Sequence, residues 1–346
     1  MRRIVGVDVA RGLAVLGMMT AHVGPDDHVP FPPGGFAQLA DGRPASLFVV
    51  LAGVSLALLS GGRDVATGTR LVQARVRVLV RALLLLGLGE LLVLLGTPVA
   101  VILPTYGLMF TFGCIALRWS RPALLLGAAT FALLGPPLVQ ALAALLLRGP
   151  LNQVVDLAVG HYYPALVWTA YLLVGMAVGR SDLRSPHLRA AGALAGISLV
   201  VLGHGGSWVA RAVLGWPERL ATSAPHSSTT FEVVGNTGVA LLVLAGALAA
   251  GDRWPRALAP LAAVGSLALT AYTVHVLAIA VLGDVVVRQP TVAGWLAFLG
   301  TTVALCWLWA STVGRGPFEW LLHRVSTAAA DVGARDEQKE EPTRVG

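Results

Sequence analysis

Three side chains in the first apolar segment could take part in chemistry across or beside a membrane. Asp8, Arg11 and His22 interrupt an otherwise apolar stretch. The eleven-residue spacing from Arg11 to His22 returns a helical side chain to within about 20° of the same direction, roughly 16 Å further along the axis. One face of this predicted helix therefore carries Arg11 low and His22 high.

These residue types fit a reaction that uses an acyl-CoA. The phosphates of a cytoplasmic acyl-CoA are matched by arginine, and Asp8 can pair with Arg11 to lower the cost of a guanidinium at membrane depth. His22 can serve as general base toward an acceptor hydroxyl or amine near the outer face. A clamp that only ties helix ends together explains the Asp8–Arg11 pair equally well, but His22 on the same face favours a polar channel.

Other ionisable residues divide between the surface and the helices. His275 lies within a predicted helix, where an ionisable group suggests function, whereas His161 and His226 are predicted as surface residues in outer loops. Glu90 is another acid in an apolar segment. Its carboxyl group could pair with a histidine or arginine, or it could form a hydrogen bond to a neighbouring helix.

The composition determines which elements must position these residues. Of 346 residues, 56% are apolar and only 12% are charged, with a mean hydropathy of +0.75. This excludes a water-soluble enzyme, a nucleic-acid-binding protein and a disordered protein. We predict an all-α, polytopic transmembrane bundle of about ten helices, at residues 4–24, 44–60, 78–96, 98–117, 123–147, 163–179, 190–205, 232–250, 258–281 and 292–313. Pro136-Pro137 is expected to kink or end the fifth helix.

Basic residues set the predicted orientation. With the N-terminus inside, 19 of the 25 Lys and Arg residues lie in cytoplasmic segments, five lie outside, and Arg11 lies in the membrane. The net charge of +7 thus marks the inner loops rather than a nucleic-acid surface. We predict a multi-pass plasma-membrane protein with both termini in the cytoplasm, a single acyltransferase-like domain over residues 1–325, and a disordered tail over 326–346.

The two cysteines, Cys114 and Cys306, both lie inside apolar runs. A disulfide framework and a CxxC metal site are therefore excluded, and no metal is expected.

Several segments carry a resemblance to known families. The spacing of Arg11 and His22 resembles the membrane acyltransferase 3 family. Residues 7–14 (VDVARGLA) and 41–53 (DGRPASLFVVLAG) are similar to the catalytic region of heparan-alpha-glucosaminide N-acetyltransferase and its bacterial relatives. The C-terminal half resembles the YeiB-like proteins, domain of unknown function 418, through residues 163–168 (YPALVW), 175–180 (GMAVGR), 266–272 (SLALTAY) and 316–322 (GPFEWLL).

The resemblance implies transfer of an acetyl or other acyl group from acetyl-CoA or another acyl-CoA to an extracytoplasmic glycan or similar acceptor. Arg11 and Asp8 would lie at the CoA. In the heparan enzyme the position of His22 is an asparagine and the catalytic histidine lies in the following outer loop, so His28 competes with His22. We favour His22, because Asp26 and Asp27 can hold His28 protonated, which leaves His28 to orient the acceptor or act as nucleophile.

An alternative to the acyltransferase is a transporter that uses the same polar face of the first helix. A transporter could pass a small molecule or anion along it without chemistry, although no internal repeat is evident. The expected partners are the bilayer, acyl-CoA, the acceptor and a second copy of the chain.

Overall fold

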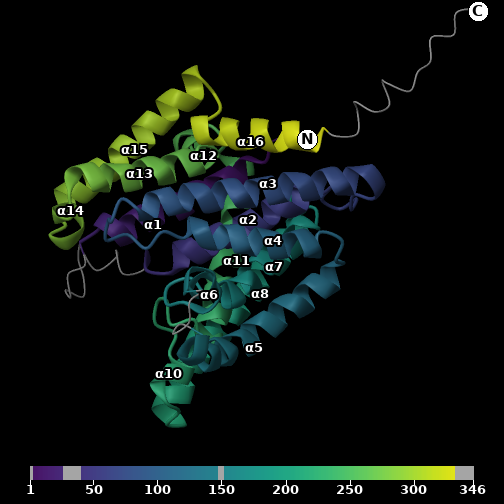
Figure 1. The fold of residues 1–346 in the computed structure, drawn as a ribbon, viewed down its shortest axis with the longest axis vertical. Helices are drawn as coiled ribbons and strands as arrows, with labels where there is room; N and C mark the ends of the chain where they lie inside the picture. Colours follow the sequence, from purple (N-terminus) through teal and green to yellow (C-terminus); the bar gives the residue numbers. More distant parts are fainter. Residues whose placement is uncertain (1–2, 26–39, 147–151, 332–346) are drawn as a thin grey trace, which may run out of the picture.

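A computed structural model describes residues 3–25, 40–146 and 152–331, and this part of the chain is all helical. In chain order the helices are α1 (Val5–Val23), α2 (Arg43–Leu59), α3 (Gly68–Val93), α4 (Leu103–Ala116), α5 (Arg121–Leu146), α6 (Asn152–Val159), α7 (Ala165–Gly179), α8 (Pro186–Val200), α9 (Gly206–Trp208), α10 (Glu218–Ala221), α11 (Thr230–Arg253), α12 (Ala259–Ser266), α13 (Ala268–Leu282), α14 (Val285–Arg288), α15 (Val292–Thr312) and α16 (Pro317–Ala330). In Figure 1, α12, α13, α15 and α16 lie on one side of α1 to α4, and α5, α8 and α10 lie on the other.

Several of these helices fit a bilayer. Within the described residues, Arg121–Ala143, Pro186–Val213, α11 and α15 are long and apolar enough to cross it. The pair of α12 and α13, bent by 80°, makes a fifth span if it is counted as one. Three shorter apolar helices, α2, α4 and α7, pack among them. The predicted helical membrane bundle is therefore confirmed, although fewer helices meet these criteria than the ten expected.

Helix boundaries depart from the prediction where polar residues continue a helix. α3 begins at Gly68 rather than at residue 78, because its arginine-rich first half is helical but too charged for a hydropathy window. α8 continues through π-helical turns at Val201–Gly205 and Val209–Val213, past the expected end at residue 205. α16 continues to Ala330, so the predicted tail starts inside a helix; residues 332–346 lie outside the described part.

Two further predictions concern the internal course of a helix. Pro136 and Pro137 lie inside α5, which continues to Leu146, one residue before its predicted end; of the two expected effects of the prolines, an early end is therefore wrong. Membrane helices tolerate proline when neighbours satisfy the backbone. The predicted helix at 258–281 is broken at Leu267, whose φ of −111° and ψ of 29° separate α12 from α13. The new N-terminus of α13 is capped by Glu319, whose Oε1 accepts from the backbone N of Leu269 at 2.7 Å and of Thr270 at 3.0 Å.

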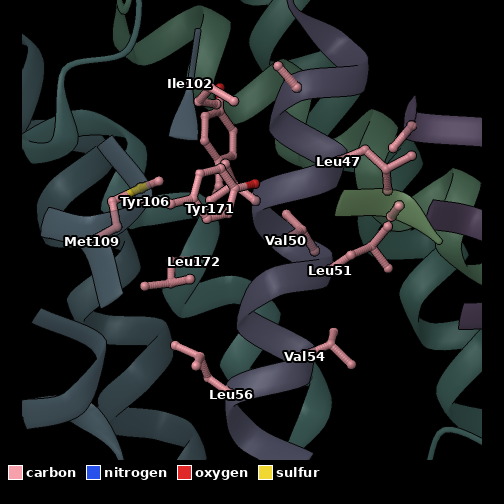
Figure 2. Close-up of a cluster of buried hydrophobic side chains, with 14 of the residues drawn as sticks. Leu47, Val50, Leu51, Val54, Leu56, Ile102, Tyr106, Met109, Tyr171 and Leu172 are labelled. Carbon is pink, nitrogen blue, oxygen red and sulfur yellow. The ribbon is translucent and has the colours of Figure 1, made fainter. Parts of the chain in front are cut away.

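The core lies where α2, α4 and α7 meet (Figure 2). A Cβ on Gly175 of α7 would overlap the carbonyl of Val50, so the two backbones touch only because this residue is glycine. Buried side chains close the remaining space, among them Leu47, Leu51, Val54, Leu56, Ile102, Tyr106, Met109, Tyr171 and Leu172.

α1 lies within the bundle, packed on α2, α11 and α12. A Cβ on Gly265 of α12 would overlap the carbonyl of Asp8, and one on Gly12 would overlap the carbonyl of Leu261. These close approaches hold the helix that carries Asp8, Arg11 and His22.

Candidate active site

The polar residues at the start of α1 form a network. Arg11 Nη1 lies 3.1 Å from Asp8 Oδ1, which confirms the predicted pairing. Arg11 Nη2 also donates to Ser55 Oγ of α2 at 2.6 Å, and Arg3 Nε lies 2.5 Å from Asp8 Oδ2. Both ends of the Arg11 guanidinium are therefore engaged, and it joins α1 to α2.

At the other end of α1, His22 meets a histidine from a distant part of the chain. Its Nδ1 lies 3.0 Å from Nε2 of His275 on α13, and the ring centroids lie 5.2 Å apart with 14° between the ring planes. His275 is 2% exposed, whereas His22 is half-buried. The more accessible imidazole is thus held by the more deeply buried one.

The surroundings of His275 favour one tautomer for this pair. Its Nδ1 is buried without a well-formed hydrogen bond and lies near the carbonyls of Ala271 and Tyr272, one turn earlier. With a proton on this nitrogen, Nε2 of His275 accepts a hydrogen bond from Nδ1 of His22. Nε2 of His22 then carries an available lone pair, which is what a general base needs.

Tyr272 supports His275 from one side. The two rings meet edge to face at 5.0 Å, and the Tyr272 hydroxyl accepts a hydrogen bond from the backbone N of Ile102, before α4, at 3.3 Å. Tyr272 is 1% exposed. The position of His275 is therefore fixed by α4 as well as by α13.

A constrained loop before α11 brings His226 toward the same region. His226 and Ser228 adopt left-handed φ angles of 58° and 50°, an uncommon conformation for residues other than glycine. Glu232 holds the loop by accepting from the backbone N of His226 at 2.8 Å and of Ser228 at 2.6 Å.

His226 is not the plain surface residue that the sequence predicts. Its ring packs against Tyr162, Tyr163 and Trp168, and it is close enough to repel His22 when both imidazoles are charged. Burial lowers the pKa of His226, which favours its neutral form.

A cavity of about 870 Å³ lies between α13 and α15. Its lining is mostly apolar and includes His275, Trp295 and Trp309, but neither Arg11 nor His22. It is therefore not the polar channel predicted along α1, which stays a prediction. Trp295 also donates from Nε1 to Thr20 Oγ1 on α1 at 3.1 Å, which ties α15 to the helix of His22.

Two further expectations from the sequence concern His28 and a metal site. His28, the competing base, lies outside the described part of the chain. Among residues 3–25, 40–146 and 152–331, no group of three or more potential metal ligands gathers in one place.

Comparison with known families connects this geometry to an enzyme class. The sequence model of heparan-alpha-glucosaminide N-acetyltransferase, catalytic, matches residues 3–205, more than half of the chain. The chain belongs to this family. The model of a protein of unknown function, DUF418, matches residues 178–329. A search of curated proteins finds no match.

The acetyltransferase-family region supplies only one member of the histidine pair. His22 lies within residues 3–205, whereas His275 lies within the DUF418 match, and the 3.0 Å contact joins them. The overlap of the two matches, residues 178–205, includes Arg180 and α8. The two regions thus contribute to one cluster rather than to separate sites.

Sequence reasoning marked His275 as unusual but did not assign it to the site. The available signal was an ionisable residue inside an apolar helix; its partner could not be read, since 253 positions separate the two histidines. Glu319 was noted only within the GPFEWLL segment, and its role at the N-terminus of α13 was missed. The signal in the sequence was an acid two residues after Gly316-Pro317.

Proposed function

We propose that this protein is an integral membrane acyltransferase that moves an acetyl or other acyl group from a cytoplasmic acyl-CoA to an extracytoplasmic glycan or similar acceptor. Membership of the heparan-alpha-glucosaminide N-acetyltransferase family supports the reaction class. The observation that carries the proposal is the hydrogen bond between His22 and His275, because it orients His22, the proposed base, at the end of α1.

The proposed steps use the pair as follows. Nε2 of His22 takes the proton from the acceptor hydroxyl or amine while the acceptor oxygen or nitrogen attacks the thioester carbonyl. The resulting tetrahedral intermediate collapses by breaking the C–S bond, and the CoA thiolate leaves. The imidazolium of His22 returns its proton to that thiolate, so the base is regenerated and no cofactor is consumed.

The donor side of the proposal rests on Arg11 and Asp8. Arginine recognises phosphate through a planar fork, and Arg11 is a quarter exposed in spite of its two partners. In this arrangement Asp8 orients the guanidinium and Arg11 contacts the donor. His28 stays the competing base in the outer loop.

The experiment follows release of free CoA from acetyl-CoA by the full chain in nanodiscs, with and without a glycan acceptor. We expect slow release from the wild type, and a decrease of about 10²- to 10⁴-fold in His22→Ala. His187→Ala is the matched control, since His187 is exposed at the start of α8. Full activity in His22→Ala beside an inactive His28→Ala variant would reassign the base. Tight acetyl-CoA binding without any release by the wild type would favour the transporter.

A further inference from the structure

Three arginines and a histidine lie where α16 packs along α3. Arg77 and Arg81 are one helical turn apart and share a face of α3. Arg81 Nε donates to Ser326 Oγ of α16 at 3.3 Å, which joins the two helices. Arg315, just before α16, and His323 within it complete the group.

The charges in this cluster act on one another. Partial burial, followed by repulsion from Arg315, Arg81 and Arg77, lowers the pKa of His323. Like charges one turn apart on a helix destabilise it, and here the repulsion also extends between helices. The cluster therefore costs folding energy unless an anion offsets it.

The described part of the chain supplies no such anion. Its ion pairs involve other cations, namely Arg3, Arg11, Arg63, Arg189, Arg211 and Arg288, and no described carboxylate lies within 4.0 Å of a charged nitrogen of the four. Moreover, Nε of Arg77 is buried without a hydrogen-bond partner. Buried polar atoms without a partner are rare and costly, so this guanidinium is expected to have a partner from outside the described part of the chain.

We propose that Arg77, Arg81, Arg315 and His323 form a binding site for phosphate groups. Guanidinium forks match phosphate oxygens with two parallel hydrogen bonds. The predicted orientation places the cluster on the cytoplasmic side, where two sources offer this chemistry. One is the nucleotide part of CoA, an assignment that rests on the proposed acyltransferase function; the other is the headgroup of an anionic phospholipid.

The position of the cluster also relates it to the cavity between α13 and α15. Trp309, which lines that cavity, donates from Nε1 to the backbone carbonyl of Arg315 at 3.2 Å. The same cavity reaches Thr270 and His275. If the phosphates of a ligand bind at the cluster, the rest of that ligand can therefore extend along this apolar cavity toward the histidine pair.

The experiment measures phosphate binding to the full chain in two arms. In phosphatidylcholine nanodiscs, the dissociation constant of adenosine 3′,5′-bisphosphate is measured for the wild type, Arg77→Gln and His323→Gln. In the second arm, the melting temperature of each variant is compared between phosphatidylcholine and phosphatidylglycerol nanodiscs. Arg256→Gln is the matched control, because Arg256 is exposed in the loop before α12.

We expect Arg77→Gln to weaken bisphosphate binding about tenfold if CoA is the source, or to abolish the stabilisation by phosphatidylglycerol if lipid is the source. Either loss, absent from the control, supports the site. Without ligand, Arg77→Gln should melt no lower than the wild type, since repulsion is relieved. Unchanged responses in both arms would overturn the proposal, as would a lower melting temperature with unaltered phosphate binding. Neither readout needs acyl transfer, so a failure of the proposed function is detected separately.

Discussion

The contact between His22 and His275 gives each imidazole a different task. His275 is buried and, with its proton on Nδ1, accepts from His22, so its proposed part is to fix the tautomer and direction of His22 rather than to touch substrate. The proposed base and its positioning residue thus come from α1 and α13, and their separation in sequence makes the arrangement sensitive to how these helices pack.

His275→Leu and His275→Gln separate the positioning role from simple packing. Leucine removes the acceptor for Nδ1 of His22, whereas the glutamine side-chain oxygen can still accept that hydrogen bond. We expect kcat of acyl transfer to fall about 100-fold in His275→Leu, with KM little changed, and to be partly restored in His275→Gln. Equal losses in both variants, in step with lower melting temperatures, would assign His275 to packing alone.

Arg11 offers a second test at the scale of one side chain. Its two terminal nitrogens bind Asp8 and Ser55, and a lysine ammonium has no planar fork to reproduce both. We expect Arg11→Lys to weaken acetyl-CoA binding about tenfold although the charge is kept. Unchanged acetyl-CoA affinity beside a lower melting temperature would instead identify Arg11 as a structural clamp.

The spacing of residues in the sequence predicted contacts between side chains one helical turn apart. It did not predict contacts between different helices. Asp8 and Arg11 are three residues apart, so their ion pair follows from helical geometry alone. The pairing of His22 with His275 depends on which faces of α1 and α13 meet. Hydropathy and periodicity do not contain this information.

At the scale of helices, one buried arginine joins three chain segments. Arg180 follows α7, is 9% exposed, and donates to the carbonyls of Gly62 at 2.8 Å and of Leu117, as well as to Ser60 Oγ at 3.1 Å. The accepting groups lie just after the C-termini of α2 and α4, where carbonyls lack helical partners and attract cations. In the sequence, Arg180 ends the GMAVGR segment and is one of the basic residues assigned to the inner loops, and neither pattern predicts these contacts.

Arg180→Leu tests this junction. It leaves these buried acceptors without their donor, and we expect a loss of about 3 kcal/mol in stability. Thermal unfolding in detergent measures it, with Arg118→Gln as the control, because Arg118 is exposed after α4. A melting temperature equal to that of the wild type would show that water replaces Arg180 at these carbonyls.

Hydropathy located several helices closely, even α1, whose apolar run is interrupted by Asp8, Arg11 and His22. α1, α2, α7 and α15 begin and end within two residues of their predicted limits. Hydropathy does not predict the break between α12 and α13, because residues 258–281 are mostly apolar and the cause lies elsewhere in the chain. Glu319 of α16 caps α13, which permits a second helix N-terminus inside an apolar run.

For the whole molecule, the orientation of the bundle decides which side each proposed site faces. The uneven distribution of Lys and Arg predicts that the loop before α3 is cytoplasmic and that the loop between α14 and α15 is outside. Thr67 and Gln289 are exposed members of these two loops. The native Cys114 and Cys306 are buried, so they should give a low background with a thiol reagent.

Thr67→Cys and Gln289→Cys therefore test the topology in intact cells. We expect a membrane-impermeant maleimide to label Gln289→Cys and to leave Thr67→Cys unlabelled until the cells are permeabilised. With this result, the Arg77 cluster faces the compartment where acyl-CoA is made, and the histidine pair lies toward the opposite side. The inverse pattern would place that cluster outside the cell, and a reaction that runs from cytoplasmic donor to outer acceptor would then have no donor site on the correct side.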